Sequence, residues 1–455
     1  MEHTIAALAT PPGVGGIAVV RISGETAYGV AARVFRPANP AKRLETAPGY
    51  TALFGHFVED GQVRDEVVAL CFRAPHSYTG EDVVELSCHG GSAASEGLLR
   101  ACYTAGALPA GPGEFTKRAF LSGRISLTQA EAVMDLIEAS SKQGAAAAAR
   151  TMEGALYEKI KAVQDHLVTV AGHIAAYTDY PEEDVPELSM EALGASLRRD
   201  RTVLDKLLAG YDTGAVLRRG VAAAIVGSPN VGKSTLLNLL AGFERAIVTP
   251  VAGTTRDVVE QELRLAGVRL HLADTAGIRD TADAVEAEGI RRSYAQLERA
   301  GLVLAVFDAS RPAGPEDLAL AEKCAGKPAV AILNKTDLDR QFDETALAPY
   351  FCKVISISAK NKDFLPIVES AVGEVLGVAD ADPDALLLAG ERQRAAAQQA
   401  RDALAEAEAA VAGGYTLDAA GVCVDDALHA LYALTGEDAT EDVIEEVFSK
   451  FCVGK

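Results

Sequence analysis

The pattern of apolar and polar positions changes character along the chain. Roughly the first 118 residues contain short apolar runs separated by turn-forming Gly and Pro, which is typical of mixed strands and helices. The runs that predict strands are Thr4–Ala9, Gly16–Ile22, Glu66–Phe72 and Asp82–Cys88, and the run that predicts a helix is Ser92–Tyr103. We therefore expect an α+β domain over residues 1–118.

Helical periodicity takes over at Glu114 and continues to about Arg219, and it returns after an Asp/Pro linker at Asp380–Asp384. An alanine run at Gly144–Arg150 suits a tight helix–helix contact, and prolines flank a break at Pro181–Pro186. The predicted helices are Thr128–Ala139, Met190–Leu208, Ala385–Ala412, Leu417–Leu434 and Glu441–Phe451. Residues 119–217 and 380–455 thus predict one discontinuous helical domain.

Between these helical segments, apolar strand-like runs end in short polar motifs. The first run, Val221–Val226, is followed by Gly227-Ser-Pro-Asn-Val-Gly-Lys233-Ser234 and then by the helix-permissive Thr235–Ala241. This matches G-x-x-x-x-G-K-[ST] in its strand–loop–helix context, in which backbone N–H groups, the helix N-terminus, Lys233 and Ser234 hold phosphates and Mg²⁺. A purely structural glycine turn is the alternative for the loop taken alone.

Four further motifs follow in the order found in GTPases. They are Thr254-Thr255-Arg256-Asp257, Asp274-Thr275-Ala276-Gly277 after the strand Val268–Ala273, Asn334-Lys335-Thr336-Asp337 after Ala329–Leu333, and Ser358-Ala359-Lys360 after Val354–Ile357. The Asp337 carboxylate can accept hydrogen bonds from N1–H and the 2-amino group of guanine, a pattern that adenine lacks. Residues 218–379 therefore predict a Ras-like P-loop G domain with a doubly wound sheet, inserted into the helical domain.

Two positions of this G domain are unusual. Ile278 stands where Ras-type enzymes place the Gln that orients the attacking water, so another group must position that water. Asn230 in the loop has two interpretations. It is either an amide that stabilises the turn, or a ligand whose oxygen helps bind a monovalent cation beside the phosphates. A K⁺ ion there would neutralise developing charge in place of an arginine finger.

Composition narrows the remaining possibilities. The 455 residues carry a net charge of −21, which argues against a broad nucleic-acid surface and confines any RNA contact to a local, strongly salt-dependent basic groove. The seven Cys include no C-x-x-C pair, which is typical of buried thiols in a reducing compartment. No secretory signal or membrane-spanning apolar run is visible, so we predict a cytoplasmic protein without a membrane partner.

Several stretches, together with the five G motifs, resemble the MnmE family (also called TrmE) of bacterial tRNA-modification GTPases, over essentially the whole chain. The stretches outside the G motifs are Thr4-Ile-Ala-Ala-Leu-Ala-Thr-Pro-Pro-Gly13, Arg21-Ile-Ser-Gly24, Ser77-Tyr-Thr-Gly-Glu-Asp82, Cys88-His-Gly-Gly91, Pro112-Gly-Glu-Phe-Thr-Lys-Arg-Ala-Phe-Leu121, Leu127-Thr-Gln-Ala-Glu-Ala132, Tyr180-Pro-Glu-Glu183 and Phe451-Cys-Val-Gly-Lys455. The resemblance implies an N-terminal folate-binding domain that forms a homodimer, a helical domain and an inserted G domain.

The resemblance also implies a reaction and a partner. The family works in a heterotetramer with a flavoprotein, MnmG (also called GidA), which alone carries the FAD. Together they add an aminomethyl-type (carboxymethylaminomethyl) group to C5 of the wobble uridine of certain tRNAs. The one-carbon unit comes from 5-formyl- or 5,10-methylene-tetrahydrofolate.

The resemblance further implies a folate site formed by Arg21, Glu85, Arg124 and Lys455. Arg124 is a departure, since some members carry Lys there, which keeps the charge but changes its geometry. Sequence physics alone favours a frayed terminal Gly-Lys over a tail docked through the apolar pair Phe451 and Val453, whereas the resemblance favours the docked tail. Cys452 matches a family cysteine once suspected of chemistry, and a packing role is the alternative.

In the G domain, the resemblance implies that K⁺ is held by Asn230, by the carbonyls of Thr249 and Val251, and by Thr254, while Ser234 and Thr255 hold Mg²⁺. Glu286 matches a glutamate that acts on the attacking water, with a solvated helix charge as the alternative, so that catalysis would involve Glu286, Asn230 and Thr255. The residues expected at the nucleotide are Asn230, Val231, Gly232, Lys233, Ser234, Thr235, Thr249, Pro250, Val251, Ala252, Gly253, Thr254, Thr255, Asp274, Thr275, Ala276, Gly277, Asn334, Lys335, Thr336, Asp337, Ser358, Ala359 and Lys360.

Two functions fit these observations. The first is a K⁺-activated GTPase that is half of a tRNA-uridine modifying enzyme. The second is a non-modifying GTPase switch, such as a ribosome-assembly factor, whose folate-like domain only dimerises. The second predicts that folate does not bind and that tRNA nucleosides are unchanged. Arg21, Glu85 and the terminal Gly-Lys favour the first.

Overall fold

The computed structural model describes residues 3–139, 141–179, 189–243, 261–272, 297–379, 385–413 and 416–455. The chain falls into two compact units, which are described separately. The first comprises Met1–Met134, Met152–Arg198 and Gln399–Lys455, and the second comprises Asp135–Thr151 and Arg199–Gln398. Within the described part of the chain, no helix is both long and apolar enough to span a bilayer. The domain boundaries expected from the sequence stay predictions.

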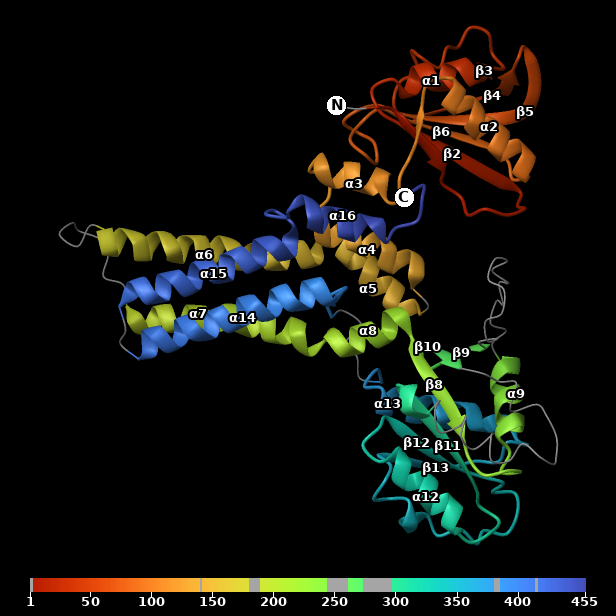
Figure 1. Cartoon of the computed structure of the whole chain (residues 1–455), viewed down its shortest axis with the longest axis vertical. Helices are drawn as coiled ribbons and strands as arrows, with labels where there is room; N and C mark the ends of the chain where they lie inside the picture. The colour runs from red at the N-terminus through yellow and green to blue at the C-terminus, as the bar shows by residue number, and fades with distance from the viewer. Residues whose placement is uncertain are drawn as a thin grey trace. The chain divides into compact units, whose positions relative to one another are not determined.

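The first unit contains a seven-stranded sheet in the order β3-β4-β5-β6-β2-β1-β7 (Figure 1). Its strands are β1 (Ile5–Leu8), β2 (Ile17–Ser23), β3 (Phe35–Pro37), β4 (Thr51–Glu59), β5 (Gln62–Phe72), β6 (Val83–His89) and β7 (Leu108–Pro109). Neighbouring strands are antiparallel, apart from β1 and β7, which are parallel. The register sets Arg21 on β2 directly opposite Glu85 on β6.

Two helices, α1 (Ala27–Val34) and α2 (Ser92–Thr104), pack on one face of this sheet and close its core. Side chains alternate between faces along a strand, so the buried Val20 and Ile22 of β2 flank a half-buried Arg21 that points to the other side. Arg21 and Glu85 therefore lie on the face of the sheet that these helices leave open.

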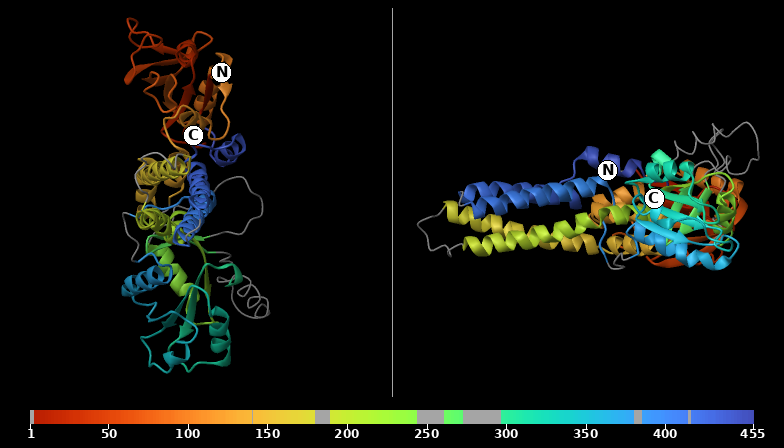
Figure 2. Two further views of the ribbon diagram at one scale, coloured as in Figure 1. Left: turned by 90° about the vertical axis from the view of Figure 1, so that its left-hand side faces the viewer. Right: turned by 90° about the horizontal axis from the view of Figure 1, so that it is seen from below.

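Long helices form the rest of the first unit, where α6 packs along α15, and the part of α7 up to Arg198 contacts the part of α14 from Gln399 (Figure 1 and Figure 2). Gln164 donates to Thr435 at 3.3 Å across the first pair, and Arg198 approaches Glu408 at 3.4 Å across the second. The helices that contribute to this unit are α3 (Glu114–Leu121), α4 (Leu127–Glu138), α6 (Ala155–Asp179), α7 (Met190–Ala209), α14 (Glu391–Ala412), α15 (Leu417–Thr435) and α16 (Glu441–Ser449).

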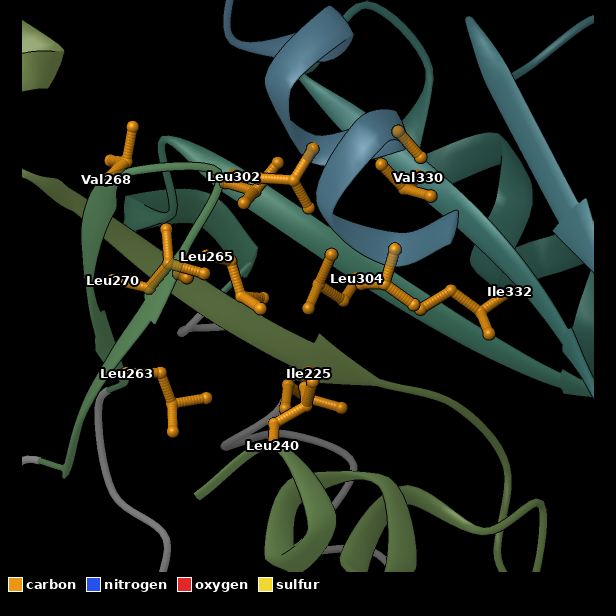
Figure 3. Close-up of a cluster of buried hydrophobic side chains, with 14 of the residues drawn as sticks. Ile225, Leu240, Leu263, Leu265, Val268, Leu270, Leu302, Leu304, Val330 and Ile332 are labelled. Carbon is orange, nitrogen blue, oxygen red and sulfur yellow. The ribbon is translucent and has the colours of Figure 1, made fainter. Parts of the chain in front are cut away.

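The second unit contains a six-stranded sheet in the order β13-β12-β11-β8-β10-β9. Its strands are β8 (Val221–Val226), β9 (Gln261–Leu265), β10 (Val268–Leu272), β11 (Leu302–Asp308), β12 (Ala329–Asn334) and β13 (Lys353–Ser356). All pairs are parallel except β9 with β10. A parallel sheet with one antiparallel edge strand is the Ras-like arrangement, as expected. Figure 3 shows the apolar core on one face, where Ile225, Leu304 and Ile332 come from three adjacent strands.

The second unit includes α5 (Lys142–Met152) and α8 (Tyr211–Arg219), together with the end of α7 and the start of α14, although the sequence assigned these segments to the helical domain. Gly144 of α5 approaches α8 so closely that a Cβ there would lie 2.7 Å from the carbonyl oxygen of Leu217. This is the tight contact that the alanine run predicts. The elements are α5 (Lys142–Met152), α8 (Tyr211–Arg219), α9 (Lys233–Phe243), α12 (Pro315–Cys324), α13 (Leu365–Val375) and the short 3₁₀ helices at Glu344–Ala346 and Lys362–Phe364.

The structure corrects one predicted helix and adds elements. The helix expected from Ala385 begins only at Glu391, because Leu387 is buried in the core of the second unit and the Gln393 side chain accepts from the N–H of Ala389. Tertiary packing here overrides a strongly helix-favouring sequence. The sequence predictions also lack α1, β3, β4, β9 and β11.

Candidate functional site

The phosphate-binding loop connects β8, a central strand of its sheet, to the first turn of α9. Three of its residues have positive φ: Gly227 at +155°, Asn230 at +62° and Gly232 at +102°. Glycine adopts such angles without strain, and Asn tolerates the left-handed region better than most residues. The loop ends at a helix N-terminus, where unpaired N–H groups attract anions. The left-handed, exposed Asn230 suits both interpretations of this residue.

Asn334 ties three of the predicted motifs together. Its side-chain amide donates to the carbonyl of Val231 in the loop at 2.9 Å, and its side-chain oxygen accepts from the N–H of Ala359 at 2.9 Å. Asn334 is 3% exposed, so these bonds are shielded from water. A Cβ at Gly232 would lie 2.3 Å from the Asn334 amide nitrogen, which explains the glycine there.

Lys233 lies where the motif predicts a phosphate-binding cation. Its ammonium donates to the carbonyls of Gly227 at 2.7 Å and Ser228 at 2.9 Å, so the loop itself positions the charge. Burial lowers the pKa of Lys233, because removal from water disfavours the charged form, and an incoming phosphate would oppose that effect. Ser234 and Thr235 follow it as exposed residues of the first turn of α9.

The motifs that the sequence predicts to recognise guanine also lie together. Asp337 accepts from the Ser358 hydroxyl at 2.8 Å and from the Lys360 ammonium at 2.8 Å. The hydrogen bonds from Lys360 and Ser358 lower the pKa of Asp337, so its carboxylate stays an ionised acceptor. Thr336 donates its N–H to Ile357, which joins the two motifs through the backbone as well.

Lys335 points in another direction, toward Asp308 at the end of β11, at 2.6 Å. Burial of Asp308 would raise its pKa, but the hydrogen bonds from Lys335 and Ser310 outweigh burial and lower it. This pair anchors the guanine-recognition motif to a neighbouring strand. Asp308 was missed at the sequence level, because β11 itself was not predicted.

The remaining nucleotide and metal residues fall outside the described residues. These are Thr249–Thr255, Asp274–Gly277 and Glu286, together with Arg256, Asp257 and Ile278. The structure therefore describes only Ser234 of the expected Mg²⁺ ligands and only Asn230 of the expected K⁺ ligands.

A second constellation lies on the open face of the N-terminal sheet. Arg21 donates to Glu85 at 2.7 Å, and both side chains are largely buried. The Arg21 guanidinium also lies 5.3 Å from the ring centre of Tyr78 and 5.5 Å from that of Phe115. A cation between two rings and a carboxylate is held in place but keeps donors for a further partner. Tyr78 and Phe115 were not predicted as site residues, although both lie in the motifs that carry the resemblance.

The C-terminal residues dock against this constellation. Arg21 donates to the carbonyl of Gly454 at 3.5 Å, and Phe115 donates its N–H to the main-chain oxygen of Lys455 at 3.1 Å. Gly454 has a φ of +97°, and a Cβ there would lie 2.0 Å from the carbonyl of Leu8. Phe451 is buried, whereas Val453 is 57% exposed and forms only a backbone bridge to Pro112. The tail is docked rather than frayed, and of the predicted apolar pair Phe451 and Val453 it is Phe451 that is buried.

The structure thus brings Arg21 and Glu85 together with the main chain of the C-terminal residues. It does not bring Arg124 into this group. Arg124 follows α3 as an exposed residue, and among the described residues no hydrogen bond or ion pair joins its side chain to the other three. Cys452 is exposed, and its main-chain oxygen accepts from Gly113.

Comparisons with known proteins cover the whole chain. The family model described as GTP-binding protein TrmE N-terminus matches residues 4–124, and the model of the MnmE helical domain matches residues 127–452. Proteins named tRNA modification GTPase MnmE are similar over 100% of both chains, at 42% identity in Symbiobacterium thermophilum and 41% in Chloroflexus aurantiacus. A solved structure of Aquifex aeolicus Era bound to GDP·AlF₄⁻ is 27% identical, the match covers 40% of this chain and 66% of that chain, and the TM-score is 0.26.

Proposed function

The chain belongs to the MnmE family of tRNA modification GTPases, and on that premise we propose that it is a K⁺-activated GTPase acting with an MnmG-like flavoprotein. It is a GTP hydrolase of tRNA modification. In our proposal, a homodimer of this chain joins the flavoprotein in the cytoplasm. Together they place a carboxymethylaminomethyl-type group on C5 of the wobble uridine of certain tRNAs. The observation that carries the proposal is the match along the full length of both chains.

The described G-domain residues support GTP as the substrate. Lys233 supplies a cation at the loop that receives the β- and γ-phosphates, and an ionised Asp337 is ready to accept from guanine. Ser234, exposed at the start of α9, fits a Mg²⁺ ligand, with Thr255 as the proposed second. Asn230 fits a K⁺ ligand, with Thr249, Val251 and Thr254 completing the proposed set. Bound K⁺ would supply positive charge where an arginine finger acts in other GTPases.

We assign orientation of the attacking water to Glu286, because Ile278 cannot hydrogen-bond to it. In the N-terminal domain, Arg21, Glu85, Arg124 and Lys455 are proposed to hold a tetrahydrofolate that supplies the one-carbon unit. The fixed Arg21–Glu85 pair between two aromatic rings fits a flat heterocycle that offers both donors and acceptors, and the cations fit its glutamate tail. The FAD belongs to the flavoprotein.

The cation assignment is tested by exchanging the salt. Turnover of GTP in K⁺ is expected to exceed turnover in Na⁺ at equal ionic strength by at least about tenfold, because a smaller ion does not fit the same ligands. The measurement is phosphate release at saturating GTP. Equal rates in the two salts would remove Asn230 from the cation site.

The role of Glu286 is tested by its replacement with Ala. Glu286→Ala is expected to bind GTP normally but to hydrolyse it at least about 100-fold more slowly, because the water loses its orienting carboxylate. Glu288→Ala, two residues further on, is the matched control. Unchanged turnover in Glu286→Ala would exclude Glu286 from the mechanism.

No feature of the described residues favours the alternative function, a non-modifying GTPase switch whose folate-like domain only dimerises.

A further inference from the structure

A basic pocket lies beside the edge strand of the N-terminal sheet. It is a cavity of about 380 Å³ whose walls come from the end of α1, from β3 and its following loop, and from Val58 on β4. Figure 1 shows these elements together in the N-terminal part of the first unit. The charged residues that line it are Arg33, Arg36, Lys42, Arg43 and a single acid, Glu45. Within a chain of net charge −21, this is a local excess of positive charge.

The four cations of this basic pocket are exposed, and no described acidic side chain forms an ion pair with them. Several other cations of the same domain are paired, as Arg73 is with Asp82 at 2.8 Å and Arg118 with Glu81 at 3.0 Å. Among the residues that the structure describes, none of the pocket cations takes part in an ion pair, and the one side-chain hydrogen bond found for them runs from Arg33 to the neutral carbonyl of Ala105. Four like charges around one cavity repel one another, so an anion in the cavity would be strongly favoured.

Protection of the sheet edge explains only part of this arrangement. Edge strands often carry a charge and a proline that prevent pairing with another chain, and Arg36 and Pro37 on β3 serve that purpose. That role does not require Arg33 on α1, or Lys42 and Arg43 beyond the strand, to line the same cavity.

We propose that this basic pocket binds phosphate groups of the tRNA backbone, an inference that rests on the proposed function. An RNA substrate needs a local basic surface on so acidic a chain, and the contact must lie where the cations are free of carboxylates. Phe35, the aromatic residue that lines the pocket, is 4% exposed and offers no face for a base to stack on. The contact therefore reads phosphates without regard to sequence.

The test is a binding titration of the full-length protein with a tRNA transcript that has uridine at the wobble position, between 50 and 200 mM KCl. Arg36→Ala/Lys42→Ala is compared with Lys159→Ala/Lys206→Ala, which removes two exposed cations from α6 and α7 and leaves the same net charge. The pocket variant is expected to bind at least about tenfold more weakly at 50 mM, with a salt slope smaller by about 1.4–1.8. The control variant is expected to match the wild type, and Arg36→Lys/Arg43→Lys to retain most of the affinity.

Three outcomes would overturn the proposal. One is an equal loss in the pocket and control variants, which would indicate general electrostatics. Another is unchanged tRNA binding in a pocket variant that no longer binds inorganic phosphate, which would make this a small-anion site. The third is weaker tRNA binding by a pocket variant that unfolds at a lower temperature than the control variant but keeps the wild-type salt slope. That result would indicate damage to the fold and no lost phosphate contacts.

Failure of this proposal is distinguishable from failure of the proposed function. The same variants are introduced into cells that lack the wild-type gene, and the wobble nucleosides are measured. If wild type restores the modified uridine but pocket and control variants bind tRNA alike, the pocket is wrong and the function stands. If wild type restores no modification, the function itself is wrong.

Discussion

The nucleotide site and the N-terminal site of this chain are assembled in opposite ways. The phosphate-binding loop is one contiguous stretch whose glycines, lysine and helix start act on neighbouring atoms. The N-terminal site joins Arg21 to Glu85 across two strands and to Gly454 at the far end of the sequence. A contiguous loop can be identified from spacing alone, whereas a site that depends on sheet register and a docked tail cannot.

Even the contiguous site depends on long-range contacts: Ser228 of the loop donates to Asp317 at 3.1 Å, and Asn334 acts as a clamp. Asn334 reaches a loop residue more than a hundred positions away and holds it against the segment that carries Ala359. The N-terminal site has a similar device in Gly454, where the backbone passes too close to Leu8 for any side chain. If the two sites are independent, a change that destroys one must leave ligand binding at the other intact.

The largest effect is expected from Asp337→Asn. The amide presents a donor where guanine also presents donors, so GTP affinity should fall at least about 100-fold. Xanthosine triphosphate, which has a carbonyl where guanine has its 2-amino group, should bind to this variant better than GTP. Nucleotide titration by fluorescence measures both, with Asp339→Asn, an exposed acid two residues on, as the control. Binding of 5-formyl-tetrahydrofolate should not change. Wild-type GTP affinity in Asp337→Asn would refute the base-recognition role.

An intermediate effect is expected from Gly454→Ala. A methyl group 2.0 Å from the Leu8 carbonyl must displace the tail and remove its contacts to Arg21 and Phe115. Affinity for 5-formyl-tetrahydrofolate, measured by calorimetric titration, should fall by about tenfold or more, as expected for losing at least one charge-assisted hydrogen bond. GTP affinity should stay at the wild-type value. Val453→Ala, at an exposed neighbour, is the control.

Two results would contradict this second prediction. Unchanged folate binding in Gly454→Ala would separate the tail from the ligand site. A parallel loss of GTP affinity would show that the two sites are not independent, and the comparison between them would fail.

The smallest effect concerns pH and the pair between His89 and Asp65, whose ring nitrogen and carboxylate lie 2.5 Å apart. The hydrogen bond that the protonated His89 ring donates to Asp65 raises the pKa of His89, so its contribution to stability is complete below the unfolded value of about 6.5 and is lost as pH rises through the higher folded value. Burial would raise the pKa of Asp65, but the hydrogen bonds from His89 outweigh it and lower that pKa. The Asp65 contribution is thus lost only as pH falls through that lower folded value.

The pair is consequently intact from roughly pH 4 to pH 6.5. His89→Gln should reduce the drop in unfolding temperature between pH 6 and pH 9 by about 1 °C, as expected for an ion pair whose histidine is exposed. His76→Gln, an exposed histidine of the same domain, should leave the drop unchanged. An identical pH response in His89→Gln and the wild type would remove this pair from the stability of the N-terminal region.

What could be predicted from the sequence follows the same division. The strand Val221–Val226, the loop after it and the guanine-recognition motifs lie as expected, because short-range spacing determines them. The late start of α14 could not be predicted, since the local sequence favours helix, and the burial of Leu387 and the hydrogen bond from Ala389 to Gln393 prevent it. The local sequence of the C-terminal residues favours a frayed end, and only the family resemblance predicted the docked tail. The hydrogen bond from Asn334 to the loop could not be predicted either, because it depends on the strand pairing that brings the two segments together.

The central claim, that this chain couples GTP hydrolysis to modification of the tRNA wobble uridine, is tested most directly by mass spectrometry of tRNA nucleosides from cells with and without the protein. The account predicts that a C5-substituted wobble uridine disappears when the protein is absent and returns with the wild type but not with Glu286→Ala. A nucleoside profile that does not depend on the protein would contradict it.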